Sequence, residues 1–282
     1  MSAATGLEHV GIVGADLAAL VGVFERLGFC LTPLAHHAGG RTGNRCVMLR
    51  HGEYLELLST VNGGASATLA RFLSRYAGAH MVALEIDDEA AALARLRQTW
   101  QTVPYAYTTE RAIDADDPMG ARARFTLITP TDPVEGRFHL IRHADRTALW
   151  QERWLHHDNN AVALVEVIFA VPEPAVTAHW FSVLAGRPVT PDPMGGFGLE
   201  LPRGRLRLLS PHGAAALLGG CVGAILPRIA GLTIATSDEG AAIEALAAAH
   251  DLPCMPDRTA VLIDAGGVVL RFPTRPFERT RR

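Results

Sequence analysis

The stretch Leu7–Val13, with the sequence LEHVGIV, decides the fold together with Asp16 and the apolar segment that ends at Leu27-Gly28. The first seven residues are typical of a short buried strand. An aspartate at a helix N-cap accepts backbone N–H bonds, and a glycine just beyond a helix supplies a left-handed turn. This stretch therefore predicts a strand followed directly by a helix.

The same succession of strand, acidic residue and helix recurs three more times. The later strands are residues 80–86, 165–171 and 232–235, and the acidic residues that follow them are Asp87, Glu173 and Asp238. Counted from Asp16, successive acidic residues lie 71, 86 and 65 positions apart. Each interval leaves room for a helix and three further strands, so the chain is expected to consist of four related modules.

Strand-like segments occupy these intervals, separated by glycine-rich turns. They are residues 29–34, 45–49, 54–59, 105–109, 123–128, 137–143, 199–201, 205–209, 260–264 and 268–272. We therefore expect an α+β protein whose four βαβββ modules pair into two cup-shaped, mostly antiparallel mixed sheets. The expected organisation is a first domain at 1–145 with modules at 6–60 and 79–143, a connector at 146–160, and a second domain at 161–282.

Composition narrows the class of protein. The chain has 282 residues, 49% hydrophobic and 20% charged, with a net charge of −3, as in soluble globular proteins and without the basic excess of nucleic-acid binders. No apolar run approaches the ~20 residues of a membrane helix, and the first residues do not resemble a signal peptide. We expect a cytoplasmic protein without nucleic-acid or membrane partners. Gly11–Gly14 lacks the third glycine of a dinucleotide fingerprint, so no nucleotide cofactor is expected.

Histidine and carboxylate residues occupy related places in the first two modules. His9 lies seven residues before Asp16, and His80 lies seven residues before Asp87. Paired modules with approximate symmetry would bring such positions together. Glu56 lies in an otherwise apolar strand, where an unpaired carboxylate is costly and needs a metal, a cation or hydrogen-bond donors. Direct alignment matches Glu56 with Leu140, whereas a shift by one residue matches it with His139, and the sequence does not decide between them.

Two histidines and a carboxylate suit Zn, Fe(II), Mn, Ni or Co. The hypothesis is a shared metal site formed by His9, Glu56 and His80. The alternative is that both histidines are core residues bonded to the backbone, and that Glu56 pairs with Arg45. The glycine-rich loop at 36–44 either lines the mouth of the site, with Asn44 and Arg45 binding a carbonyl or carboxylate, or is an ordinary connector.

These residues resemble the opening module of the vicinal oxygen chelate superfamily, which includes glyoxalases, extradiol dioxygenases and bleomycin-resistance proteins. The resemblance rests on residues 7–12, on 24–29 and on 54–58. Residues 42–45, His143 with 149–150, and 157–161 are similar to the glyoxalase-like domain family in particular. The specific resemblance covers about residues 6–170.

The resemblance implies His9, Glu56 and His80 as metal ligands, with His139 uncertain, and Glu56 and His139 as candidate catalytic groups. The positions that match His9 in the third and fourth modules are Glu166 and Gly231, and Arg207 stands where Glu56 stands. Because arginine cannot ligate a cation, the second half is expected to hold no metal.

The implied function is a metal-dependent enzyme acting on a small molecule with vicinal oxygens, as a lyase, isomerase or dioxygenase. The alternative is a metal-free protein that sequesters a small ligand, as bleomycin-resistance proteins do. A small-molecule ligand is the expected partner, and a homodimer is possible.

Overall fold

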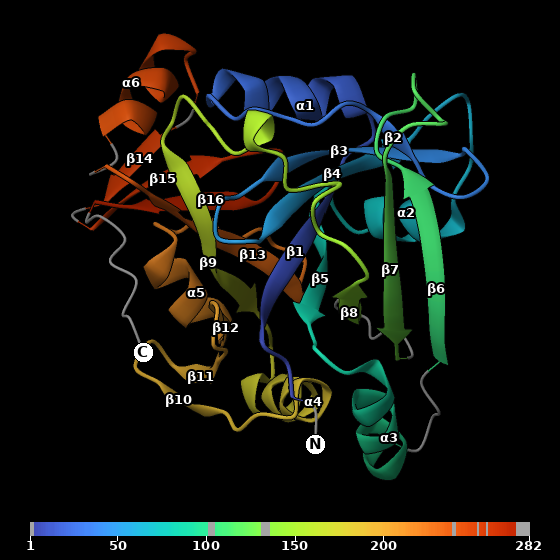
Figure 1. The fold of residues 1–282 in the computed structure, drawn as a ribbon. Helices are drawn as coiled ribbons and strands as arrows, with labels where there is room; N and C mark the ends of the chain where they lie inside the picture. Colours follow the sequence, from blue (N-terminus) through green and yellow to red (C-terminus); the bar gives the residue numbers. More distant parts are fainter. Residues whose placement is uncertain are drawn as a thin grey trace.

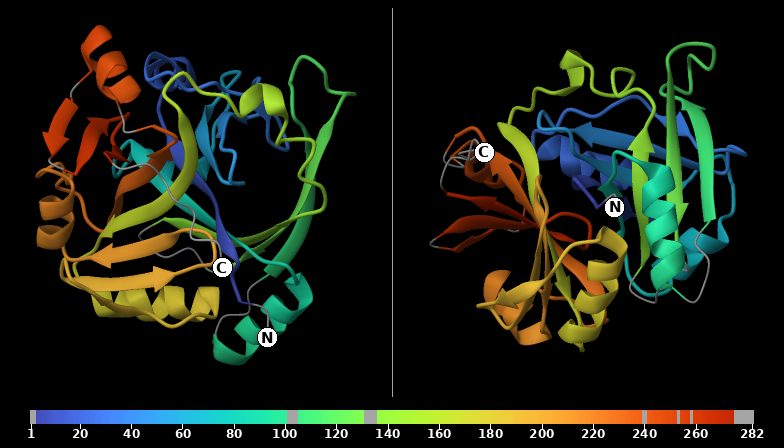
Figure 2. Two further views of the ribbon diagram at one scale, coloured as in Figure 1. Left: turned by 60° about the vertical axis from the view of Figure 1, so that its left-hand side comes forward. Right: turned by 60° about the horizontal axis from the view of Figure 1, so that its bottom comes forward.

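The computed structural model describes residues 3–100, 105–130, 136–238, 241–252, 254–257 and 259–274. The chain forms two eight-stranded mixed sheets with the same strand order, so the architecture is α+β as the repeat predicts. Figure 1 shows the sheet of the second half on the left and that of the first half on the right. Figure 1 and the two further views in Figure 2 both show the two sheets as separate layers.

The first sheet has the order β2-β3-β4-β1-β5-β8-β7-β6. Its central strands β1 and β5 are antiparallel to each other, and each has a parallel neighbour, β4 and β8 respectively. The strands are β1 (Gly6–Val13), β2 (Ala35–His36), β3 (Thr42–Met48), β4 (Tyr54–Thr60), β5 (Gly78–Glu85), β6 (Tyr105–Ala112), β7 (Arg122–Thr129) and β8 (Arg137–His143). The strand expected at residues 29–34 does not form. The first strand after α1 is instead the two-residue edge strand β2.

The second sheet repeats this arrangement in the order β10-β11-β12-β9-β13-β16-β15-β14. Its strands are β9 (Ala161–Ala170), β10 (Thr190–Asp192), β11 (Gly196–Glu200), β12 (Arg205–Leu209), β13 (Arg228–Thr236), β14 (Cys254–Asp257), β15 (Ala260–Asp264) and β16 (Val269–Pro273). The same pairing pattern recurs, with β9 antiparallel to β13 and parallel to β12.

Helices follow the first strand of each module. They are α1 (Leu17–Arg26), α3 (Glu89–Thr99), α4 (Pro174–Ala185) and α6 (Ala241–Ala249), while the shorter α2 (Ala67–Leu73) and α5 (Pro211–Leu217) follow β4 and β12, and a 3-10 turn, η1, spans Glu152–Trp154. Asp16 caps α1 through its side chain, as predicted. The cap of α3 is Asp88 rather than Asp87. Among the described residues, no helix combines the length and apolar character needed to cross a membrane.

A bulge in each central strand sets which side chains enter the first cup. In β1 the register shifts between Leu7 and His9, so Glu8 is an extra residue. In β5 the register shifts opposite Gly11 and Ile12, and His80 is the extra residue. An extra residue moves the following side chains to the opposite face of the sheet. His9 and Gly11 therefore face the cup, and Val10 and Ile12 face the other way.

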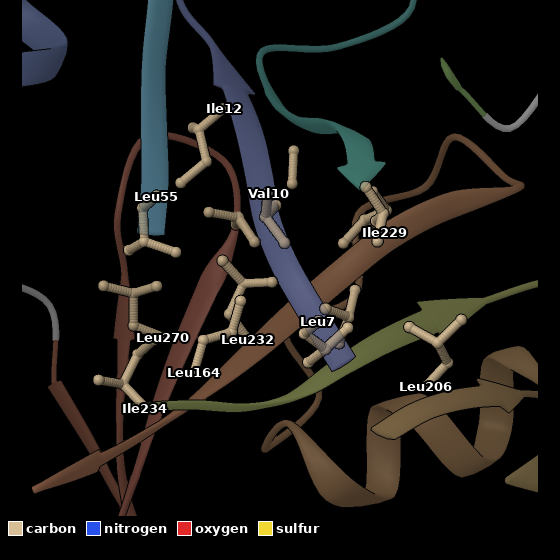
Figure 3. Close-up of a cluster of buried hydrophobic side chains, with 14 of the residues drawn as sticks. Leu7, Val10, Ile12, Leu55, Leu164, Leu206, Ile229, Leu232, Ile234 and Leu270 are labelled. Carbon is tan, nitrogen blue, oxygen red and sulfur yellow. The ribbon is translucent and has the colours of Figure 1, made fainter. Parts of the chain in front are cut away.

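The faces turned away from the cups pack against each other and form the main core. Figure 3 shows Val10 and Ile12 from β1 in the same cluster of side chains as Leu232 and Ile234 from β13. All four are fully buried and belong to one cluster that draws on both sheets. Burial on one face against the second sheet, and on the other face in the cup, explains why every residue of β1 is buried.

Candidate functional site

The first cup encloses a cavity of about 320 Å³. Residues of β1, β3, β4, β5, β6, β7 and β8 contribute, together with the loop after β2 and the start of α2. The lining residues are His9, His37, Ala38, Thr42, Tyr54, Glu56, Leu58, Ser66, Thr68, Leu69, Met81, Tyr107, Thr109, Arg111, Phe125, Leu127, Arg137 and His139. A volume of this order accommodates a small molecule.

His9 enters the cavity with one ring nitrogen already engaged. Its Nδ1 is hydrogen-bonded to Oε2 of the fully buried Glu8, which the bulge places beside it. The other carboxylate oxygen of Glu8 accepts a bond of 2.7 Å from Nε2 of His143. Burial alone would lower the pKa of His9, but the carboxylate of Glu8 raises it. Within the described residues, Nε2 of His9 has no hydrogen-bond partner, so this atom is available to a ligand in the cavity.

Glu56 is held in its charged form. Its Oε1 accepts hydrogen bonds from Nδ2 of Asn44 and, at 3.2 Å, from Nε2 of His37. Burial would raise the pKa of Glu56, but the hydrogen bond and charge of His37, with the charges of His9 and Arg111, lower it to about 2. In the part of the chain that the structure describes, Oε2 accepts no hydrogen bond, so Glu56 offers one anionic oxygen to the cavity.

His139 also lines the wall of the cavity. Its Nδ1 lies 2.9 Å from Oγ1 of Thr129. Burial and the nearby charges of His9 and Arg137 lower the pKa of His139 to about 3, so the ring is neutral at physiological pH. Across the described ranges, Nε2 of His139 forms no hydrogen bond. A neutral imidazole with one nitrogen held and the other open is the form that ligates a metal.

His80 is not brought to the cavity. Its ring stacks on Phe72 and Tyr76, with centroid distances of 4.7 and 4.0 Å, and Nε2 donates a 2.8 Å hydrogen bond to the carbonyl of Tyr76. It is a core histidine with a backbone partner, which was the alternative prediction. Burial lowers its pKa to about 4.

Strand register explains why His80 is not the equivalent of His9 and lies one residue away from the equivalent position. His9 pairs with Tyr54 in β4, and Gly11 pairs with Glu56; in the second module Met81 pairs with Arg137, and Ala83 pairs with His139. Met81 is therefore the equivalent of His9, and His139 is the equivalent of Glu56. The helix cap agrees, because Met81 lies seven residues before Asp88, the true N-cap of α3.

The predicted substrate-binding residues Asn44 and Arg45 do not line the cavity. Asn44 is fully buried and supports Glu56 from behind. Arg45 points to the other face of β3, where its Nε donates to the carbonyl of Thr32 and its Nη1 pairs with Glu25 at 3.0 Å. The alternative in which Arg45 neutralises Glu56 is therefore not what the structure shows.

The loop at 36–44 lines part of the cavity, which was one of the two interpretations of the sequence. The residues that do so are His37, Ala38 and Thr42.

Other cavity residues lie on β6 and were not predicted. On β6, Tyr107, Thr109 and Arg111 occupy alternate positions and all line the wall. This alternation was present in the sequence, since side chains two apart on a strand share a face. It gave no signal because most of β6 is polar and exposed, which is also typical of an edge strand facing solvent.

The donor chemistry of His9, Glu56 and His139 fits a divalent metal. Two imidazoles and one carboxylate match the preferences of Zn, Mn and Fe(II), and Glu8 supplies the carboxylate partner that metal-bound histidines usually have. As the side chains stand, no three His, Cys, Asp or Glu residues within the described ranges are close enough to hold a metal ion. Metal binding would therefore draw the three donors together.

The comparisons with known proteins agree with this architecture. A family model described as a glyoxalase-like domain matches residues 7–185. A hypothetical protein from Staphylococcus aureus has a TM-score of 0.68 at 14% identity, covering 98% of this chain and 100% of its own. An extradiol ring-cleaving dioxygenase from B. fuscum gives 0.57 at 14% identity, with 98% and 73% coverage. The Mn(II)-bound glyoxalase from Novosphingobium aromaticivorans gives 0.58 at 12% identity, with 96% and 82% coverage.

Identities this low show a common fold and no more. No functionally curated protein matches the sequence significantly. The family model spans more than half of the chain and includes β1, β4, β5 and β8, which carry His9, Glu56 and His139. The chain therefore belongs to the glyoxalase-like domain family, within the vicinal oxygen chelate superfamily.

Proposed function

We propose that this protein is a metal-dependent enzyme that acts on a small molecule with two adjacent oxygens, and that His9, Glu56 and His139 hold the metal. One observation carries the proposal. Each of these side chains lines the same cavity, has one polar atom held by a protein partner, and presents its other polar atom without a partner among the described residues.

The protonation states of Glu56 and His139 support metal binding. A ligating imidazole must be neutral and a ligating carboxylate must be charged. The pKa of about 3 for His139 and of about 2 for Glu56 meet both conditions at neutral pH. The raised pKa of His9 favours a proton on both ring nitrogens, so a metal would displace the proton on Nε2 while Nδ1–H stays hydrogen-bonded to Glu8.

The metal would supply a Lewis acid that polarises the oxygen pair of the substrate. The protein's residues bind and orient the substrate around it. His37 is placed to move a proton, because its Nδ1 is held 2.9 Å from Oγ1 of Thr42 and its Nε2 lies at the cavity wall, 3.2 Å from Glu56. Leu58, Met81 and Phe125 keep part of the wall apolar. Isomerisation, elimination and ring-opening oxygenation are all compatible with these groups.

The metal content of purified and reconstituted protein tests the proposal. We expect about one equivalent in the wild type, and a loss of affinity greater than about 100-fold in His9→Ala and His139→Ala, because each removes a direct ligand. His80→Asn is the matched control: it also changes a buried histidine on the first sheet, but one outside the cavity, and should keep its metal.

Two results would contradict the proposal. If His139→Ala and His80→Asn lose metal equally, the ligand set is wrong. If the wild type holds less than about one-tenth equivalent of any transition metal and gains none on reconstitution, the protein is a metal-free binder of the bleomycin-resistance type.

A further inference from the structure

We infer that the cavity recognises a small molecule bearing a carboxylate, which Arg111 binds. The inference rests on the proposed function for the use of this cavity, but the recognition of the anion requires no metal. Arg111 projects from β6, the strand on the far side of the first sheet from the second half of the chain in the left view of Figure 2. It is not one of the proposed metal ligands.

The guanidinium of Arg111 is buried, and few hydrogen bonds offset the cost of removing its charge from water. The residue is 7% exposed, and its single hydrogen bond within the described residues runs from Nη1 to the carbonyl of Ala112 at 3.5 Å. It forms no ion pair in the part of the chain that the structure describes. A guanidinium has five N–H donors and stays charged, so burying it without an anion is costly. A cavity that places such a group on its wall is suited to an anionic ligand.

Among the described residues, neither of the carboxylates nearest the cavity forms an ion pair with Arg111. Glu56 accepts from Asn44 and His37, and Glu8 is held between His9 and His143. The other guanidinium on the wall, that of Arg137, donates to Oγ1 of Thr68 at 3.2 Å. The charge of Arg111 still reaches Glu56, since it helps to lower the pKa of that carboxyl. The ligand's anionic group would thus lie in the same cavity as the proposed metal donors.

The surroundings of Arg111 indicate what the carboxylate is attached to. Along β6 the next inward residues are Thr109 and Tyr107, which pair across the sheet with Phe125 and Leu127 of β7. Aromatic and aliphatic side chains therefore line the wall beside the guanidinium. This combination fits a carboxylate on an apolar or aromatic body, because a polyol or a highly charged phosphate ester would leave polar groups unpaired there.

Matched pairs of an acid and its neutral amide test the inference: benzoate against benzamide, and acetate against acetamide. Affinities are measured by calorimetry on the full-length protein as purified, in a low-chloride buffer. We expect at least one acid to bind about tenfold to 100-fold more tightly than its amide, as for a charge-assisted hydrogen bond. Arg111→Gln should abolish this preference while leaving the affinity for the amide unchanged.

Two further variants separate specific binding from general electrostatics. Arg124→Gln removes the same charge from the exposed residue next to Ala123 on β7, and should keep the preference for the acid. Arg111→Lys keeps the charge but loses the planar fork, and should keep part of the preference. Because Arg111 has so few partners, Arg111→Gln should not lower the melting temperature.

The inference is overturned if neither acid binds more tightly than its amide, or if Arg124→Gln and Arg111→Gln weaken acid binding equally. The metal content of Arg111→Gln, measured in parallel, distinguishes the two proposals. Preference for the acid that depends on Arg111 in a protein without metal would support this inference and contradict the proposed metal dependence. Full metal loading with no preference for the acid would do the reverse.

Discussion

The carboxylate of Glu8 determines the chemical state of His9. The two residues are neighbours in sequence and would normally point to opposite faces of a strand. The bulge places them together, and Glu8 is fully buried between His9 and His143. Burial would raise the pKa of Glu8, but the charges of His143 and His9 lower it well below its ordinary value, so it remains charged. The charge of Glu8 in turn keeps His9 oriented and basic.

Replacing Glu8 by glutamine tests this role. In Glu8→Gln the pKa of His9 should fall, because burial is then opposed only by the charge of Glu56. An NMR titration of the imidazole in metal-free protein measures the change. His157, bonded outside the cavity to the carbonyl of Met48 at 2.9 Å, serves as an internal control that should not move. Metal affinity should fall about 10- to 100-fold. An unchanged His9 titration would show that Glu8 does not set this pKa.

At the same scale, the sequence could predict His9 and Glu56 as cavity residues, left the choice between His139 and Leu140 open, and gave no sign of Met81. A carboxylate in an apolar strand and a histidine before a capped helix are local signals. The error of one residue at His80 came from two features that single-sequence reasoning cannot detect: a bulge in β5 and the choice of Asp88 over the adjacent Asp87 as helix cap. Because side chains alternate along a strand, a shift of one residue moves a side chain from the face that lines the cavity to the face that packs in the core.

At the scale of elements, ion pairs between charged side chains connect the turns of the second sheet to those of the first. Arg203, before β12, donates to Glu53 at 3.0 Å and pairs with Glu85 at the end of β5, and Arg146 pairs with Glu85 at 2.5 Å. The second oxygen of Glu53 is buried and has no hydrogen-bond partner in the described chain. Burial therefore raises the pKa of Glu53 to about 7, although the charge of Arg203 opposes it.

The sign of the resulting pH dependence is set by proton binding. Between pH 4.5 and about 7 the folded protein retains a proton on Glu53 that the unfolded chain has lost, so stability falls as the pH rises through this window. Glu53→Gln removes this term. The variant should gain about 3 kcal/mol relative to wild type between pH 4 and pH 8, measured by urea denaturation at both values. A constant difference between the two proteins would show that Glu53 titrates normally.

The repeat of modules was readable from the sequence because helix caps and apolar strands are local features. The packing of the two sheets was not, since the sequence contains no mark of which face of β1 meets β13. Elements with few apolar residues were also poorly predicted: β2 is only two residues long, and β6 extends three residues beyond its predicted end.

At the scale of the whole molecule, the two cups have the same topology but different contents. In the second cup, Arg207 and Glu166 stand at the places of Glu56 and His9. Arg207 is bound to Asp192 at 2.8 and 2.7 Å, and Glu166 pairs with Arg205. Gly231 occupies the position in the second sheet that Met81 occupies in the first. A Cβ at Gly231 would clash with the side chain of Leu218, so the glycine leaves room for that leucine. Apolar residues in and after α5 pack against that sheet. A metal-free second half remains our prediction, because arginine cannot ligate a cation.

Because both sheets share one core, the chain should unfold as a unit. Leu232 is fully buried in the cluster between β1 and β13 (Figure 3). Leu232→Ala leaves a cavity that neither sheet can fill alone, and should lower stability by about 2–5 kcal/mol. Calorimetry should show one transition in both proteins, displaced to lower temperature in the variant. Leu218→Ala is the control, because Leu218 belongs to the separate apolar cluster of the second cup rather than to the core between the sheets. Two separate transitions in the wild type, of which Leu232→Ala shifts only one, would show that the halves fold independently and that the shared core does not couple them.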